Sequence, residues 1–265
     1  MKIWNALLVS LLHFSSSAQN TLGPHLTAMG GNGTSVKDVW AIQGNASAIT
    51  DIEKPSVSVT YIKHLFSNEI STQAVVFVIP LGKNFVGAGY QQYGFSEYTQ
   101  SKATFAYGKK FGQHLSIAIK GNYHQLKIPD YGSTSAFSVD VGALYEVGRF
   151  TFGACINNPS GQKFIHSQVS SAITTSISVG ATYFASDKVL IAGYFTKYIH
   201  QVTDAGLGLD YKIIKILSLR GGFSVRPAKQ YAGFGLNFNK LNIEIATAHD
   251  VNLGYEPQIG LGYAF

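Results

Sequence analysis

The side chains most able to do chemistry lie on two segments in which polar and apolar residues alternate. In one segment Asn122 and His124 share a face, and in the other Ser138 and Asp140 do. A serine, a histidine and a carboxylate are the residue types that a hydrolytic site needs as nucleophile, base and orienting group. An enzyme with a convergent set of these three side chains is therefore one hypothesis for this chain.

The same side chains have a structural interpretation, as the polar filling of a narrow barrel. With 8 His and many serines, chance triads are common. Unpaired buried charge is costly, so a polar interior is expected to consist of ion pairs and hydrogen bonds. We favour this interpretation and predict no catalytic residues. The residues expected to face the interior are Lys120, Asn122, His124, Asp140, Glu146, Asp210, Lys212, Arg220, Asn237 and Glu244.

Other kinds of site are not indicated. The histidines show no metal-ligand spacing such as HExxH, and Cys155 is the single cysteine, so we predict no metal site and no disulfide. The glycine-rich stretch 30–33 is not followed by Lys-Ser/Thr, which excludes a P-loop, and no cofactor is predicted. The net charge is +6, but the basic residues are scattered. They suit anionic lipid headgroups or lipopolysaccharide better than nucleic acid.

The C-terminus indicates which elements position these side chains. From Gln258 to Phe265, small or polar residues alternate with Ile259, Leu261, Tyr263 and Phe265. This period of two is typical of a strand. A bacterial outer-membrane barrel commonly ends in this way, because its last strand pairs with its first and leaves no open edge. We therefore predict that Tyr263 and Phe265 belong to the strand that closes a transmembrane barrel.

The remaining sequence supports an all-β antiparallel barrel of about fourteen strands. Only 13% of the residues are charged and the mean hydropathy is +0.10, values that suit strands with one lipid face and one polar face. The longer connections 127–135 and 158–171 are assigned to the cell surface. A soluble β-sandwich is the alternative. The predicted strands are 57–61, 71–80, 85–95, 98–109, 115–124, 136–147, 150–157, 172–184, 188–199, 204–213, 216–225, 230–239, 241–249 and 258–265.

The N-terminus divides into two parts that do not alternate. Residues 1–18 combine Lys2, an apolar stretch and a run of small residues, which predicts a signal peptide; a buried first helix is the alternative. Residues 19–53 form an extension before the barrel, which is assigned to 54–265. The chain is thus expected to be exported to the outer membrane of a bacterium.

The extension also carries a resemblance to a known family. The stretch AMGGNGTSVKDVWAIQGNASAI resembles the N-terminal signature of FadL-like barrels, although Asn45-Ala46-Ser47 stands where the family has Asn-Pro-Ala. Residues 85–126 look most similar to the PorV/PorQ branch, which is associated with type IX secretion in Bacteroidota. The resemblance implies a plug inside the barrel, with the motif residues Met29, Gly30, Gly31, Gly33, Asp38, Trp40 and Asn45.

Three hypotheses for function remain open at this point. The resemblance implies a non-catalytic accessory barrel that binds protein partners, such as another barrel, a lipoprotein or a secreted client. The second is a FadL-like channel for small hydrophobic molecules, and the third is an outer-membrane enzyme. A lumen crossed by ion pairs would favour the first hypothesis, whereas a continuous apolar path would favour the second.

Overall fold

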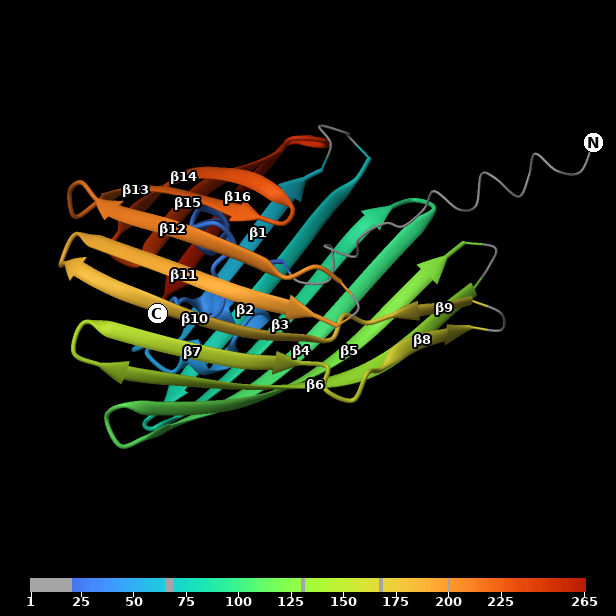
Figure 1. Cartoon of the computed structure of the whole chain (residues 1–265), viewed down its shortest axis with the longest axis horizontal. Helices are drawn as coiled ribbons and strands as arrows, with labels where there is room; N and C mark the ends of the chain where they lie inside the picture. Colours follow the sequence, from blue (N-terminus) through green and yellow to red (C-terminus); the bar gives the residue numbers. More distant parts are fainter. Residues whose placement is uncertain (1–20, 65–68, 130–131, 167–168, 200) are drawn as a thin grey trace, which may run out of the picture.

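The computed structural model describes residues 21–64, 69–129, 132–166, 169–199 and 201–265. These residues form a closed antiparallel barrel of 14 strands, as the alternation predicts, and three short helices precede the first strand in the chain (Figure 1). No helix in the described part of the chain is long and apolar enough to cross a membrane. The elements are α1 Pro24–Ala28, η3 Val39–Gln43, η4 Ala46–Ile49, β1 Ser56–Lys63, β2 Ser71–Leu81, β3 Asn84–Phe95, β4 Tyr98–Phe111, β5 Leu115–Ile128, β6 Gly132–Val147, β7 Phe150–Asn157, β8 Lys163–His166, β9 Val169–Ala172, β10 Ser176–Ser186, β11 Val189–Tyr198, β12 Asp204–Lys212, β13 Leu217–Val225, β14 Ala228–Phe238, β15 Leu241–Asp250 and β16 Gly254–Ala264.

The barrel closes between its first and last strands. β1 pairs with β16 from Ser56 opposite Ala264 to Ile62 opposite Gln258. The N–H of Phe265 donates to the carbonyl of Pro55 at 3.0 Å, so the backbone pairing continues beyond β16. Since a bilayer offers no partner to an unpaired backbone group, this closure is what allows the sheet to cross a membrane.

The two faces of the wall differ sharply in chemistry. Along β6, Phe137, Val139 and Val141 point outward with 69%, 46% and 45% of their surface exposed, whereas Ser138 and Asp140 are buried inside. Large apolar side chains are exposed in the same alternating way on the other strands of the barrel. An apolar outer band around a polar interior is the arrangement of a membrane-spanning barrel.

The two ends of the barrel also differ. At the end that holds the chain's C-terminus, the connections are two to four residues long, such as Gly148-Arg149 and Asn239-Lys240. Short connections of this kind face the periplasm in outer-membrane barrels. At the opposite end, the connection 158–175 contains the two-stranded sheet β8–β9, which extends beyond the barrel (Figure 1).

Some predicted boundaries were wrong at this second end. Most of the loop predicted at 127–135 is strand, because β5 continues to Ile128 and β6 begins at Gly132. The loop predicted at 158–171 contains β8 and most of β9, and the strand predicted at 172–184 begins only at Ser176. These segments lack clear alternation because they extend past the lipid band, where no apolar face is required.

The N-terminal segment, residues 21–55, runs inside the barrel, where α1, η3 and η4 contact the inner wall (Figure 1). Two side chains cap its short helices: Asp38 accepts a hydrogen bond from the N–H of Trp40, and Asn45 accepts one from the N–H of Ser47. Trp40, Ile42 and Ile49 are almost fully buried and form one apolar cluster with the inward side chains of Val76 and Val78. The segment therefore supplies much of the barrel's core.

Glycines in the wall make room for this segment. A Cβ atom on Gly208 would lie 2.2 Å from the carbonyl oxygen of Met29, and one on Gly153 would lie 2.1 Å from that of Thr34. Any side chain at these positions would displace the backbone of the segment. The wall and the segment are thus in direct backbone contact on β7 and β12.

A charge on the outer face should destabilise the barrel. Val141 lies near the middle of β6, so Val141→Arg is expected to lower the free energy of unfolding by about 2–4 kcal/mol in lipid vesicles. Val147→Arg, at the end of the same strand, is the control and should cost about 0–1 kcal/mol. Equal effects of the two substitutions, measured by urea unfolding, would contradict the assigned depth.

Removal of the last residue should impair assembly. The Phe265 N–H extends the β1–β16 seam, and its ring packs edge-on against Tyr263 at 5.1 Å. Deleting Phe265 is expected to reduce the amount of folded barrel in the outer membrane, measured by heat-dependent mobility on gels. Phe265→Tyr keeps the ring and the N–H and should assemble normally.

Candidate functional site

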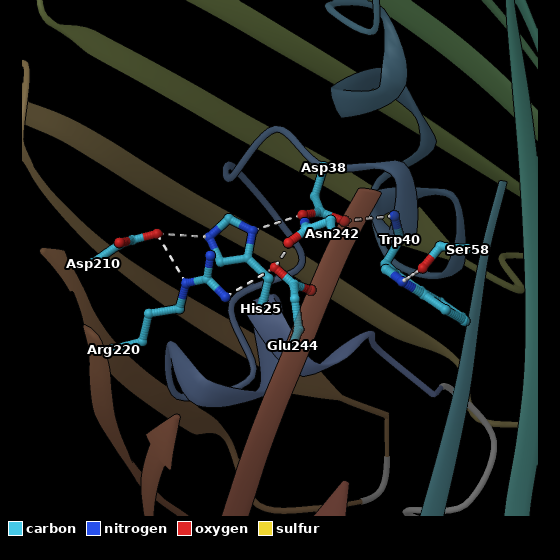
Figure 2. Close-up of polar contacts among 8 residues, drawn as sticks. All are labelled: His25, Asp38, Trp40, Ser58, Asp210, Arg220, Asn242 and Glu244. Atoms are coloured by element: carbon cyan, nitrogen blue, oxygen red, sulfur yellow. Dashed lines mark hydrogen bonds and ion pairs between the residues drawn. The ribbon is translucent and has the colours of Figure 1, made fainter. Parts of the chain in front are cut away.

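An ion-pair network joins the N-terminal segment to the wall at α1 (Figure 2). His25 lies between two carboxylates, with Nδ1 2.6 Å from Asp38 Oδ2 in the segment and Nε2 3.1 Å from Asp210 Oδ2 on β12. Arg220 on β13 continues the network, because its guanidinium lies 3.0 Å from Asp210 and 2.9 Å from Glu244. All five side chains have at most 14% of their surface exposed. Burial of such charges is tolerated only when they are paired in this way.

The network favours the protonated form of His25. Burial by itself lowers the pKa of His25, and Arg220 lowers it further, but the contacts with Asp210 and Asp38 outweigh both and raise the pKa to about 9. Burial alone would raise the pKa of Asp38, whereas the ion pair with His25 and the Trp40 N–H lower it. At neutral pH, a cationic His25 therefore bridges the segment and the wall.

A second cluster holds η3 and η4 against the opposite wall. Lys120 on β5 lies 3.1 Å from Asp140 on β6, directly across from it in the sheet. Its ammonium also donates to the carbonyls of Gln43 and Gly44, at 3.2 and 2.9 Å. Asn45 donates to the carbonyl of Ala143 on β6 at 3.1 Å. This side of the segment is thus fixed through its backbone.

The possible catalytic triad does not assemble in the form that hydrolysis needs. His124 Nε2 lies 2.9 Å from Ser138 Oγ, but the carboxylate of Asp140 is bound by Lys120, Asn122 and the N–H of Asn158. The hydroxyl also accepts a hydrogen bond from Asn122. These contacts satisfy buried polar groups and tie the connection after β7 to the wall.

Two further sets of contacts hold the segment in the lumen. Near the short connections, Lys37 and Lys110 are each paired with both Asp51 and Glu146. On the other side, the Tyr194 hydroxyl on β11 donates to the carbonyl of Gly30 at 3.1 Å and contacts Asp204 at 3.0 Å. The segment is therefore bound by polar contacts on several sides of the lumen.

The structure places the sequence-predicted residues as follows. Met29, Trp40 and Asn45 are buried in the segment, and Asp38 takes part in the His25 network. Lys212 and Asn237 are exposed near the short connections rather than enclosed, because β12 and β14 end there. Sequence reasoning did not single out His25 or Tyr194. Tyr194 alternates with outward residues, as the other interior residues do, whereas His25 carries no local signal. Residues 1–18, the predicted signal peptide, lie outside the described residues.

The segment should become easier to release at high pH. Since the pKa of His25 is raised from 6.5 to about 9, its contribution of about 3 kcal/mol is complete below pH 6.5 and is lost as the pH rises through 9. Proteolysis of the segment is expected to accelerate between about pH 6.5 and 9. His25→Gln, which cannot be protonated, should remove that step. An identical pH profile for both proteins would contradict the role of His25.

The barrel is similar in fold to solved transporters. It matches the toluene transporter TbuX of Ralstonia pickettii at 14% identity and a TM-score of 0.70, covering 94% of this chain and 100% of the other. It matches the toluene transporter TodX of Pseudomonas putida at 11% identity and a TM-score of 0.72, covering 93% of this chain and 99% of the other. It also matches a FadL homologue of Pseudomonas aeruginosa at 12% identity and a TM-score of 0.65, covering 92% of this chain and 98% of the other. At these identities the likeness shows a shared fold.

The sequence itself points to one family. No curated protein matches the chain. The family model of the type IX secretion system membrane protein PorP/SprF matches residues 53–256, which include most of the barrel. The narrower resemblance to the PorV/PorQ branch stays a prediction. With its membrane-spanning barrel and this match over most of its length, the chain belongs to the PorP/SprF family of type IX secretion system membrane proteins.

Proposed function

We propose that the protein is a non-catalytic accessory subunit of a type IX secretion complex in the outer membrane, where it binds protein partners. Residues 1–18 would be the export signal, residues 19–53 a fixed plug, and residues 54–265 the barrel. Family membership supports a place in a secretion complex. Fold alone does not decide the function, whereas the contents of the lumen distinguish a subunit from a channel.

The observation that carries the proposal is the way in which charged contacts cross the lumen. The His25 network and the Lys120 cluster bind the segment to opposite walls, and the pairs around Asp51 bind it near the short connections. A hydrophobic molecule passing through would have to break buried ion pairs, each of which costs about 3–5 kcal/mol when one partner is lost. Partners would then bind at the ends or the outer wall of the barrel.

Uptake of small hydrophobic molecules is the competing function. It is supported by the fold that the chain shares with TbuX and TodX, which are described as toluene transporters. This function would require the segment to move aside. Arg220→Met would leave the Glu244 carboxylate without its cation and Asp210 with His25 alone. The loss of this pairing should loosen the contacts around α1, so this variant separates the two functions.

The first experiment is purification of the tagged protein from native outer membranes in mild detergent. We expect a stoichiometric protein partner with the wild-type chain, and no uptake of a hydrophobic dye by vesicles that contain the chain. A lone barrel that carries bound fatty acid, together with dye uptake that rises in Arg220→Met, would instead establish the channel. Val147→Leu, a mild change on the outer face, is the control, and it should behave like the wild-type protein in both measurements.

A further inference from the structure

The outer wall carries an apolar groove of about 600 Å³ across β7 and β10 to β13. Its floor is made by the small outward residues Ala181, Gly193 and Ala205. Ala181 lies opposite Gly193, and Ala205 lies opposite Phe195 on the neighbouring strand. Larger side chains flank this floor, including Phe195 with 64% of its surface exposed. The flanking residues are Phe152, Phe195, Leu207 and Phe223. The groove therefore opens toward lipid rather than toward the lumen.

Basic side chains lie at the short connections of the same strands. Arg149 precedes β7, Lys188 precedes β11, and Lys212 ends β12, and all three are exposed. Backbone and side-chain contacts hold these connections side by side: Arg149 donates to the carbonyl of Ala185, and the N–H of Lys212 donates to the carbonyl of Lys188. Asp187 is the acidic residue exposed beside them. The group keeps a positive excess of two charges.

A row of aromatic rings connects the basic group with the groove. Phe150 follows Arg149 directly and stacks on Tyr183 of β10 at 4.7 Å and on Phe152 at 6.0 Å. Phe152, which lines the groove, is three residues from Arg149, or about 10 Å along the strand. One leaflet of a membrane has a hydrocarbon depth of about 15 Å, so a single lipid chain can span this distance.

The charge of the whole molecule is concentrated at this end. Among the described residues, the short-connection end has ten basic and four acidic residues, namely Lys37, Lys54, Lys83, Lys109, Lys110, Arg149, Lys188, Lys212, Lys215 and Lys240 against Asp51, Glu53, Glu146 and Asp187. At the opposite end, the numbers of basic and acidic residues among the described residues are nearly equal. The basic residues there are Lys63, Lys127, Lys163, Lys197, Arg226 and Lys229, and the acidic residues are Glu69, Glu97, Asp204, Asp250 and Glu256.

We propose that this face of the barrel binds an anionic phospholipid, with its headgroup at Arg149, Lys188 and Lys212 and an acyl chain in the groove. The cations match the anionic headgroup of such a lipid, and the lipid-facing apolar groove matches its acyl chain. Lipopolysaccharide would instead meet the opposite end, where charge is balanced. The site depends only on the barrel's place in a membrane and is independent of the proposed function.

The test is native mass spectrometry of the purified full-length protein with phosphatidylglycerol or phosphatidylcholine. The wild-type protein is expected to retain phosphatidylglycerol preferentially. The double substitution Arg149→Gln and Lys188→Gln should weaken this retention about thirtyfold. Ala181→Phe fills the groove with an apolar side chain and should weaken retention of both lipids. Heat-dependent gel mobility checks that each variant is a folded barrel.

Matched controls make the result specific to this face. Lys54→Gln with Lys83→Gln removes two exposed cations, one just before β1 and one between β2 and β3, and Ala103→Phe enlarges an outward side chain on β4. Both controls should bind lipid like the wild-type protein. Equal loss in the controls, unchanged binding in Ala181→Phe, or equal retention of the two lipids by the wild-type protein would each overturn the proposal.

Discussion

The closure of β1 against β16 is the constraint on which the rest of the structure depends. Once the backbone of all 14 strands is paired, the sheet can stand in lipid, but it also encloses a lumen. Part of that lumen is occupied by the N-terminal segment, whose apolar cluster packs on β2 and whose charged side chains pair with residues of β4, β6 and β12. The polar residues inside the wall are thus explained first by the need to seat this segment.

With the lumen filled in this way, the proposed function uses the outside of the barrel. The chain shares its fold with toluene transporters, yet paired charges lie across the lumen where a hydrophobic solute would pass. What remains available to other molecules is the sheet β8–β9 beyond one end, the basic connections at the other, and the outer wall. Interaction with a large partner in a secretion complex requires no more than these surfaces.

Much of the barrel could be predicted from sequence because the bilayer imposes a period of two on every strand. The same alternation assigns Lys120 and Asp140 to the interior, and the register places them opposite each other. The sheet β8–β9 and the extended ends of β5 and β6 were missed, since they lie past the lipid band and have no such pattern. The His25 network could not be predicted, because its contacts join residues 10 to 185 positions apart, and the proximity of His25 to the wall depends on how the segment enters the barrel.

The glycines of the inner wall have a consequence for how such barrels diversify. At Gly208 and Gly153 the strand backbone touches the carbonyls of Met29 and Thr34, so the surfaces of the wall and the segment are complementary in shape. A side chain gained on one surface must be matched by a change of path in the other. Segments taken from related barrels will therefore not be interchangeable, and the two parts are bound to evolve as a single unit.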